Sequence, residues 1–108
     1  MSLTILLFYT GKGGAARRFA EEMERRGIAA KIRAEDGNER YEYFFPAEDG
    51  ETVLLIDKWR DPAALAAHHA SPMMREIAAL REKYDLHMAV ERLRPAEDGG
   101  DDEKFIRK

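Results

Sequence analysis

The stretch ETVLLIDKWRDPAALAAHHASPMM, residues 51–74, predicts a strand that leads straight into a helix. Thr52–Trp59 is an apolar, β-favouring run that ends in the only tryptophan of the chain, as expected of a buried strand. Asp61 and Pro62 then have the residue types preferred at the N-cap and at the first position of a helix. We therefore expect a strand–helix unit, and we expect any functional site to lie in it.

The predicted helix runs from Asp61 to about Ala70 and carries two of the three histidines, His68 and His69. Adjacent helical side chains point about 100° apart, so these two cannot both face one pocket squarely. Ser71 is followed by a proline that interrupts the helix, and its hydroxyl is expected to cap a second helical segment. An apolar stripe at helical spacing supports that segment: Met73, Ile77, Leu80 and Tyr84.

The N-terminal part predicts a strand and an amphipathic helix. Leu3–Tyr9 is a short apolar run that ends at the turn residues Thr10–Gly14. Ala15–Arg26 has apolar residues at helical spacing with charged residues between them, and Gly27 supplies the stop.

Between the helix and residue 51, the sequence predicts a connector and a second strand. Ile28–Glu35 is interpreted as short irregular or helical structure, and Asp36–Asn38 as a turn. Arg40–Phe45 alternates, and this places three aromatic residues on one strand face: Tyr41, Tyr43 and Phe45.

The order of the predicted elements is β-α-β-β-α-β, which is typical of a ferredoxin-like α+β domain. Leu86–Leu93 is the last strand, and Pro95 ends it. With 108 residues the chain has room for one core, so we expect one domain over residues 1–95. The acidic tail, residues 96–108, is expected to be mobile or to dock on a partner subunit.

The first strand is apolar on both faces, with Leu3, Ile5 and Leu7 on one side and Leu6 and Phe8 on the other. Two helices can cover only one face of a four-stranded sheet, and a bare apolar face of this size is unusual on a monomer. A second copy of the chain, packed sheet to sheet, is the simplest cover. We therefore predict a homodimer formed through the sheet face.

Composition excludes several classes of protein. The chain contains 44% hydrophobic and 36% charged residues, as in globular rather than disordered proteins, and its net charge of −3 argues against nucleic-acid binding. It has no cysteine, so disulfides and thiolate sites are excluded. No apolar run reaches the roughly 20 residues of a membrane span, and the N-terminus lacks the features of a signal peptide. We expect a cytoplasmic protein without a membrane partner.

Three segments, RYEYFFP (Arg40–Pro46), VLLIDKWRDPAAL (Val53–Leu65) and HHASPMM (His68–Met74), resemble the antibiotic biosynthesis monooxygenase domain family. Within it they are most similar to the small quinol monooxygenase branch. The resemblance covers roughly residues 3–94. The family pattern of a strand ending in Trp, an Ala-Leu helix, a His and a Ser-Pro pair is matched by Trp59, Ala64-Leu65, His68 and Ser71-Pro72.

This resemblance implies a dimeric α+β barrel with a pocket between sheet and helices in each subunit. It also implies oxidation of a phenolic or quinol substrate by O₂ without a metal or flavin cofactor. A phenol has a pKa near 10 and reduces O₂ far better as its anion, so a histidine base suits the reaction at neutral pH. The resemblance favours His68 as that base. The sequence offers these residues for an aromatic pocket: Trp59, Tyr41, Tyr43, Phe45, His69 and Met73.

Each candidate also has a purely structural interpretation. Trp59 and the tyrosines are suited to plain core packing, Met73 to filling irregular space, and the histidine pair to an interface or the surface. A metal site is not expected, because adjacent histidines lack the i,i+4 spacing of a ligand pair. The glycine-rich segment Gly11–Gly14 lacks the order of a phosphate-binding loop, so a flexible turn is favoured.

Haem binding can be weighed against a haem-degrading branch of the same family. That branch uses a histidine about ten residues after the position of His68 and an asparagine on the first strand. The corresponding residues here are Ile77-Ala78-Ala79, Leu3–Tyr9 contains no asparagine, and His87 lies elsewhere. The sequence therefore argues against haem.

Three classes of function remain. The first is a cofactor-independent monooxygenase acting on a quinol or phenol with His68 as the base. The second is an isomerase of a small carbonyl metabolite on the same scaffold, whose activity would persist without oxygen. The third is a non-catalytic, dimeric ligand-binding module, which would bind a small ligand without forming product.

Overall fold

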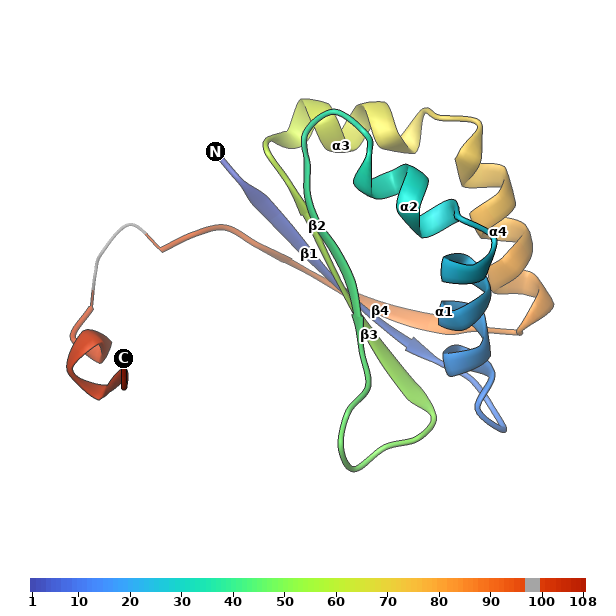
Figure 1. Ribbon diagram of the computed structural model, residues 1–108, viewed down its shortest axis with the longest axis horizontal. Coiled ribbons are helices and arrows are strands. Elements are labelled where there is room, and N and C mark those ends of the chain that lie inside the picture. Colours follow the sequence, from blue (N-terminus) through green and yellow to red (C-terminus); the bar gives the residue numbers. More distant parts are fainter. Residues whose placement is uncertain (97–99) are drawn as a thin grey trace.

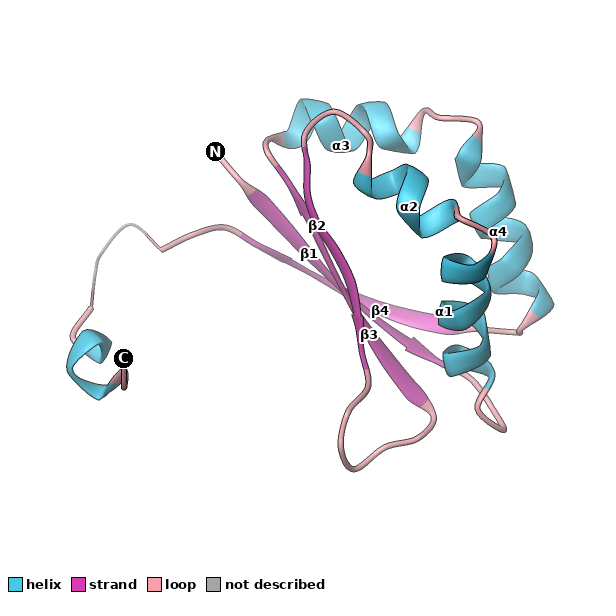
Figure 2. Cartoon of the chain, viewed as in Figure 1, coloured by secondary structure: helices cyan, strands magenta, loops and turns pink. Residues whose placement is uncertain are grey.

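A four-stranded antiparallel sheet forms one layer of the protein, and all the helices of the sheet–helix body lie on one of its faces (Figures 1 and 2). The computed structural model describes residues 1–96 and 100–108. The elements in chain order are β1 (Leu3–Thr10), α1 (Ala15–Arg25), α2 (Ile28–Arg33), β2 (Asn38–Phe44), β3 (Thr52–Trp59), α3 (Pro62–His69), α4 (Met73–Lys83), β4 (His87–Leu93) and a short 3₁₀ helix, η1 (Asp102–Phe105).

The strand order β2-β3-β1-β4 places β1 and β3 in the centre of the sheet. In this register Leu7 of β1 lies opposite Leu55 of β3 and Val90 of β4. The order of elements confirms the predicted ferredoxin-like α+β fold. The predicted connector 28–35 is helical, and it adds α2 to the two helices of the basic pattern.

Alternation along the two central strands decides which side chains enter the core. Leu3, Ile5, Leu7 and Tyr9 of β1 are buried beneath the helices, and the residues between them are half-buried on the other face. Strand β3 repeats the pattern with four buried residues that point to the helix layer: Val53, Leu55, Asp57 and Trp59. The helices complete the core mainly with Phe19, Met23, Ile28, Ile32, Leu65, Ile77 and Leu80.

The start of α3 is as predicted, and the start of α4 is not. The Asp61 carboxylate accepts a hydrogen bond from the Ala64 backbone N–H at 2.8 Å, and Pro62 begins the helix. The expected cap by Ser71 was wrong: Pro72 takes the cap position of α4, and the Ser71 hydroxyl is buried without a partner in the described part of the chain. The Ser71 carbonyl accepts from the Met74 N–H instead.

Two turns fix the ends of the strands. Gly37 has a φ of +87°, and a Cβ added there would lie 2.5 Å from the Cβ of Ala64, so the turn into β2 needs a glycine. At the other end of the sheet, the Glu51 carboxylate accepts hydrogen bonds from the N–H groups of Gly13 and Gly14 at 2.7 and 3.1 Å. An internal carboxylate thus occupies the N–H groups that a phosphate would need, in line with the predicted plain turn.

The face of the sheet opposite the helices is not covered by any of the described elements (Figure 1). It carries half-buried apolar side chains from three strands: Leu6, Phe8, Phe44, Leu54 and Ile56. The helices within residues 1–96 and 100–108 include none that is long and apolar enough to span a membrane.

Candidate functional site

A cavity of about 210 Å³ lies between the helix-facing side of the sheet and helices α3 and α4. Its apolar walls come from β1, β3, β4 and both helices: Ile5, Leu7, Leu55, Leu65, Met74, Ile77, Met88 and Val90. Its polar groups are Tyr41, Asp57, His68, His69, Arg81 and Arg92. The strand–helix unit of residues 51–74 contributes half of those polar groups.

His68 is a buried polar side chain of this cavity, and only 4% of it is exposed. Its Nδ1 lies 3.0 Å from each carboxylate oxygen of Glu35, which follows α2. Because an ionised carboxylate can only accept, Nδ1–H is the donor, and a proton acceptor in the deprotonated ring is then Nε2. The Trp59 ring stacks on the imidazole with the ring centres 4.9 Å apart. Glu35 and Trp59 thus hold the ring, and Nε2 remains for a ligand.

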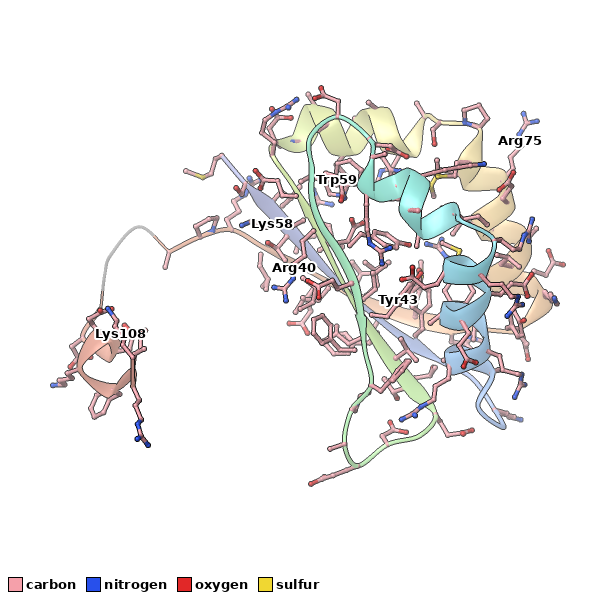
Figure 3. The ribbon with its side chains drawn as sticks, viewed as in Figure 1. Arg40, Tyr43, Lys58, Trp59, Arg75 and Lys108 are labelled. Atoms are coloured by element: carbon pink, nitrogen blue, oxygen red, sulfur yellow. The ribbon has the colours of Figure 1, made fainter. Side chains whose placement is uncertain are left out.

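Trp59 occupies the end of β3 and points to the helix layer, whereas Lys58 and Arg40 belong to the opposite face (Figure 3). It is fully buried, and its indole N–H has no hydrogen-bond partner in the described part of the chain. Trp59 does not line the cavity, contrary to the prediction. It supports the His68 ring by stacking on it.

Asp57 is a second buried ionisable group of the cavity, with 6% of its surface exposed. The Asn38 side-chain amide donates to it at 3.4 Å, and no Lys or Arg within the described residues forms an ion pair with it. Burial raises the pKa of the Asp57 carboxyl to about 6, although nearby His68, the Trp59 indole and the Asn38 amide oppose this rise. Asp57 is therefore ionised at neutral pH but is a stronger base than an ordinary aspartate.

Cationic side chains gather at the part of the cavity formed by α4 and β4. Arg81 donates to the Tyr9 hydroxyl at 2.9 Å, while its Nε is buried without a partner in the described part of the chain. Arg92 lies on the exposed edge strand β4. Burial lowers the pKa of His69, and the positive charges of His68, Arg92 and Arg81 lower it further. His69 therefore lines the cavity mainly as a neutral ring.

The predicted pocket residues do not all come together. Tyr41 lines the cavity beside His68, and burial raises the pKa of its phenol well above the usual value. Tyr43 does not line the cavity: its hydroxyl oxygen lies 3.2 Å from that of Tyr41, and its ring packs against Phe19. Phe45 lies outside the cavity: it follows the end of β2, is 48% exposed, and carries the Arg17 guanidinium 4.5 Å above its ring.

The structure places Met74, and not Met73, in the cavity wall. Met73 lies instead on the outer side of α3, where it lines a shallow hollow together with Glu35 and Ser71. The two methionines are adjacent and both pack against the core, so the sequence pattern does not distinguish which one lines the cavity.

Three functional candidates were not singled out from the sequence: Glu35, Asp57 and Arg81. Asp57 had a detectable signal, because it occupies an inward position of a strand whose other inward residues are apolar. Glu35 had none, since it lies 33 residues from His68 and in a segment without clear periodicity. The sequence does not distinguish Arg81 from the other charged residues of the amphipathic helix α4.

A larger hollow of about 680 Å³ lies on the outer side of the molecule between α1, α2 and β2. It is open and shallow, and three of its charged residues form ion pairs: Arg33 with Glu24, and Glu42 with Arg40. It contains no histidine. The smaller cavity at His68 therefore offers the better-defined chemistry. The described residues bring together no group of three or more His, Asp or Glu side chains that could hold a metal ion.

Comparisons with known proteins identify the family of the chain. Residues 2–80 match the family described as antibiotic biosynthesis monooxygenase. The "Putative monooxygenase YcnE" of Bacillus subtilis is 33% identical over 56 residues, which are 52% of this chain and 59% of that protein. This chain thus spans about three fifths of the length of that relative.

Solved structures share the fold over most of their length. SnoaB from Streptomyces nogalater, a cofactor-independent oxygenase, superposes with a TM-score of 0.76 at 17% identity, covering 93% of this chain and 98% of SnoaB. PA3566 from Pseudomonas aeruginosa has a TM-score of 0.70 and 30% identity, covering 88% and 95%. Since the family match extends over 79 of the 108 residues, the chain belongs to the antibiotic biosynthesis monooxygenase family.

Proposed function

We propose that this protein is a monooxygenase that oxidises a small quinol or phenol with O₂ and needs neither metal nor flavin, with His68 as the general base. The observation that carries the proposal is the arrangement of His68, whose Nδ1 is held by Glu35 while Nε2 remains for a ligand in the cavity. The family assignment and the fold shared with a cofactor-independent oxygenase support it.

The cavity suits the first step of such a reaction. Nε2 of His68 would accept the phenolic proton, and the Glu35 carboxylate would stabilise the imidazolium that forms. The resulting phenolate is the form that passes an electron to O₂. Apolar walls such as Leu55 and Ile77 keep water away from the reduced oxygen species. A volume of about 210 Å³ lies below the roughly 300–1,000 Å³ of drug-sized pockets, which favours a small ring system.

The test is O₂ consumption over a panel of quinols and phenols that includes menadiol, with the wild type compared with His68→Ala. Loss of the base should lower kcat/KM by about 10²–10⁴-fold. His87→Ala is the matched control, because His87 is exposed on β4 and does not line the cavity. Wild-type inactivity across the panel, or equal activity of His68→Ala, would refute the proposal. Turnover that persists without oxygen would instead identify an isomerase.

We further propose that a second copy covers the sheet face opposite the helices. The half-buried apolar residues of β1 and β3 on that face, among them Leu6 and Ile56, support a sheet-to-sheet homodimer. Ile56→Glu would place a charge in the interface, whereas Ala78→Glu changes an exposed position of α4. Sedimentation should show a dimer for the wild type and Ala78→Glu, and a monomer for Ile56→Glu. A monomeric wild type at micromolar concentration would disprove the dimer.

A further inference from the structure

The cavity contains a buried carboxylate for which the first proton transfer has no use. Asp57 lines the same cavity as His68, is 6% exposed, and forms no ion pair within the described residues. Its one hydrogen bond of ordinary geometry is the long contact to Asn38 at 3.4 Å, and the Trp59 indole N–H, which has no other partner in the described part of the chain, lies near it. A structural aspartate at this depth would be expected to have a cation or several N–H donors around it. Asp57 therefore has free acceptor capacity in the cavity.

Oxygen insertion requires a second deprotonation, this time at a ring carbon. Once the phenolate has reduced O₂ and the two radicals have joined, the ring carbon bears both a hydrogen and a peroxide group. His68 returns the phenolic proton to that peroxide, which gives a hydroperoxide. Forming the carbonyl then requires a base that removes the hydrogen from carbon. His68 has its Nε2 lone pair back at this stage, but it reaches the cavity from α3 and faces the phenolic oxygen, whereas Asp57 reaches the cavity from β3 and can face the ring carbon.

We propose that Asp57 is the second proton-transfer residue of the reaction and removes the carbon-bound hydrogen of the hydroperoxide. The C–H electron pair forms the new C=O bond, the O–O bond breaks, and hydroxide leaves. The hydroxide takes the proton back from Asp57, which restores the carboxylate and gives water. For menadiol the balance is C₁₁H₁₀O₂ + O₂ → C₁₁H₈O₃ + H₂O, with O₂ as the oxidant. This inference rests on the proposed function.

The surroundings of Asp57 suit this role. The ionisable groups that influence it or are influenced by it come from four sides: Tyr9 of β1, Tyr41 of β2, Glu35 after α2 and His68 of α3. Burial, aided by the negative charge of Glu35, raises the pKa of the Asp57 carboxyl to about 6, so the group is ionised at pH 7.5 and more basic than an exposed aspartate. The two phenols stay protonated at that pH, since burial raises the pKa of each.

The test uses the full-length protein with menadiol and with menadiol carrying deuterium at the free ring carbon, C3. The reaction is run under ¹⁸O₂, so that the oxygen atom inserted into the product is labelled. Asp57→Asn should form the labelled hydroxylated quinone about 10²–10⁴-fold more slowly than the wild type. A hydroperoxide should accumulate, and a primary isotope effect of C–D over C–H should appear on product formation. Asp57→Glu, which restores a carboxylate, should recover most of the rate. Asp49→Asn, which changes an exposed aspartate of the β2–β3 turn, should equal the wild type.

Each alternative result has one meaning. Product formation by Asp57→Asn within about threefold of the wild type would overturn the inference. A slower rate without hydroperoxide, and equal for the two isotopic substrates, would also overturn it, because a merely structural loss slows every step. Wild-type inactivity with the whole quinol panel would refute the proposed function itself, and that result is visible before any variant of Asp57 is measured.

Discussion

Replacement of Asp57 by asparagine should make the protein more stable at neutral pH. Its carboxyl pKa is about 6 in the folded protein against a usual 3.8, and this difference corresponds to about 3 kcal/mol of folding free energy. The sign follows from proton binding: between pH 4 and 6 the folded state holds the proton more tightly than the unfolded state. The contribution of Asp57 to the stability of the wild type is therefore fully present below pH 4, and it is lost as the pH rises through 6.

An asparagine in place of Asp57 cannot ionise, so the D57N variant should lack this loss. Urea denaturation at pH 4, 5, 6, 7 and 8, at one protein concentration, measures the free energy of unfolding of both proteins. The variant should match the wild type at pH 4 to within about 1 kcal/mol and exceed it by up to about 3 kcal/mol at pH 8. Ionisable groups that do not interact with Asp57 are common to both proteins and cancel in the difference, whereas the interactions of Asp57 with His68 and Glu35 are part of the measured change.

Asp36→Asn is the matched control. The Arg60 guanidinium beside Asp36 lowers the pKa of that carboxyl, so its contribution to stability is present above the usual pKa and is lost as the pH falls. The stability difference should therefore run in the opposite direction from that of Asp57. A D57N variant that is less stable than the wild type at pH 8, or a difference that does not change with pH, would refute the assignment of Asp57 as a strained, basic carboxylate.

Two further predictions concern the body of the fold. Hydrogen bonds from Lys83 and Tyr84 lower the pKa of Glu22 to about 2, so its contribution to stability should be complete above pH 4.5 and should be lost toward pH 2. In acid unfolding, the difference in unfolding free energy between the wild type and Glu22→Gln should shrink over that pH range and no other. Gly37→Ala should cost at least about 1–2 kcal/mol in urea denaturation, because the residue has a φ of +87° and the new methyl group would meet Ala64; a neutral change would show that the turn can relax.

The elements of the fold were predictable from local sequence, because each carries its own signal. The limits of β3 follow from the run Thr52–Trp59, and the start of α3 follows from Asp61 and its proline. The family followed from motifs confined to such local segments. Caps, strand runs and short motifs depend only on residues a few positions apart, so they can be recognised in the sequence.

The composition of the site was less predictable, because it depends on exact boundaries and on distant packing. Phe45 leaves the aromatic face since β2 ends one residue earlier than expected, and of the adjacent Met73 and Met74 it is Met74 that lines the cavity, a difference of one residue that the apolar pattern does not resolve. The contact between Glu35 and His68 forms only when α2 packs beside α3, and no pattern along the chain reports it.

The position of β4 at the edge of the sheet determines how a ligand would enter. Met88 and Val90 line the cavity, yet 47% and 48% of these side chains remain exposed. The cavity therefore reaches the solvent-exposed edge strand β4 at these two side chains. Larger or smaller side chains at these two positions would widen or narrow the range of ring systems that enter, while the proton-transfer groups deeper inside stay as they are. Under the proposed function, substrate breadth and reactivity would then depend on different residues.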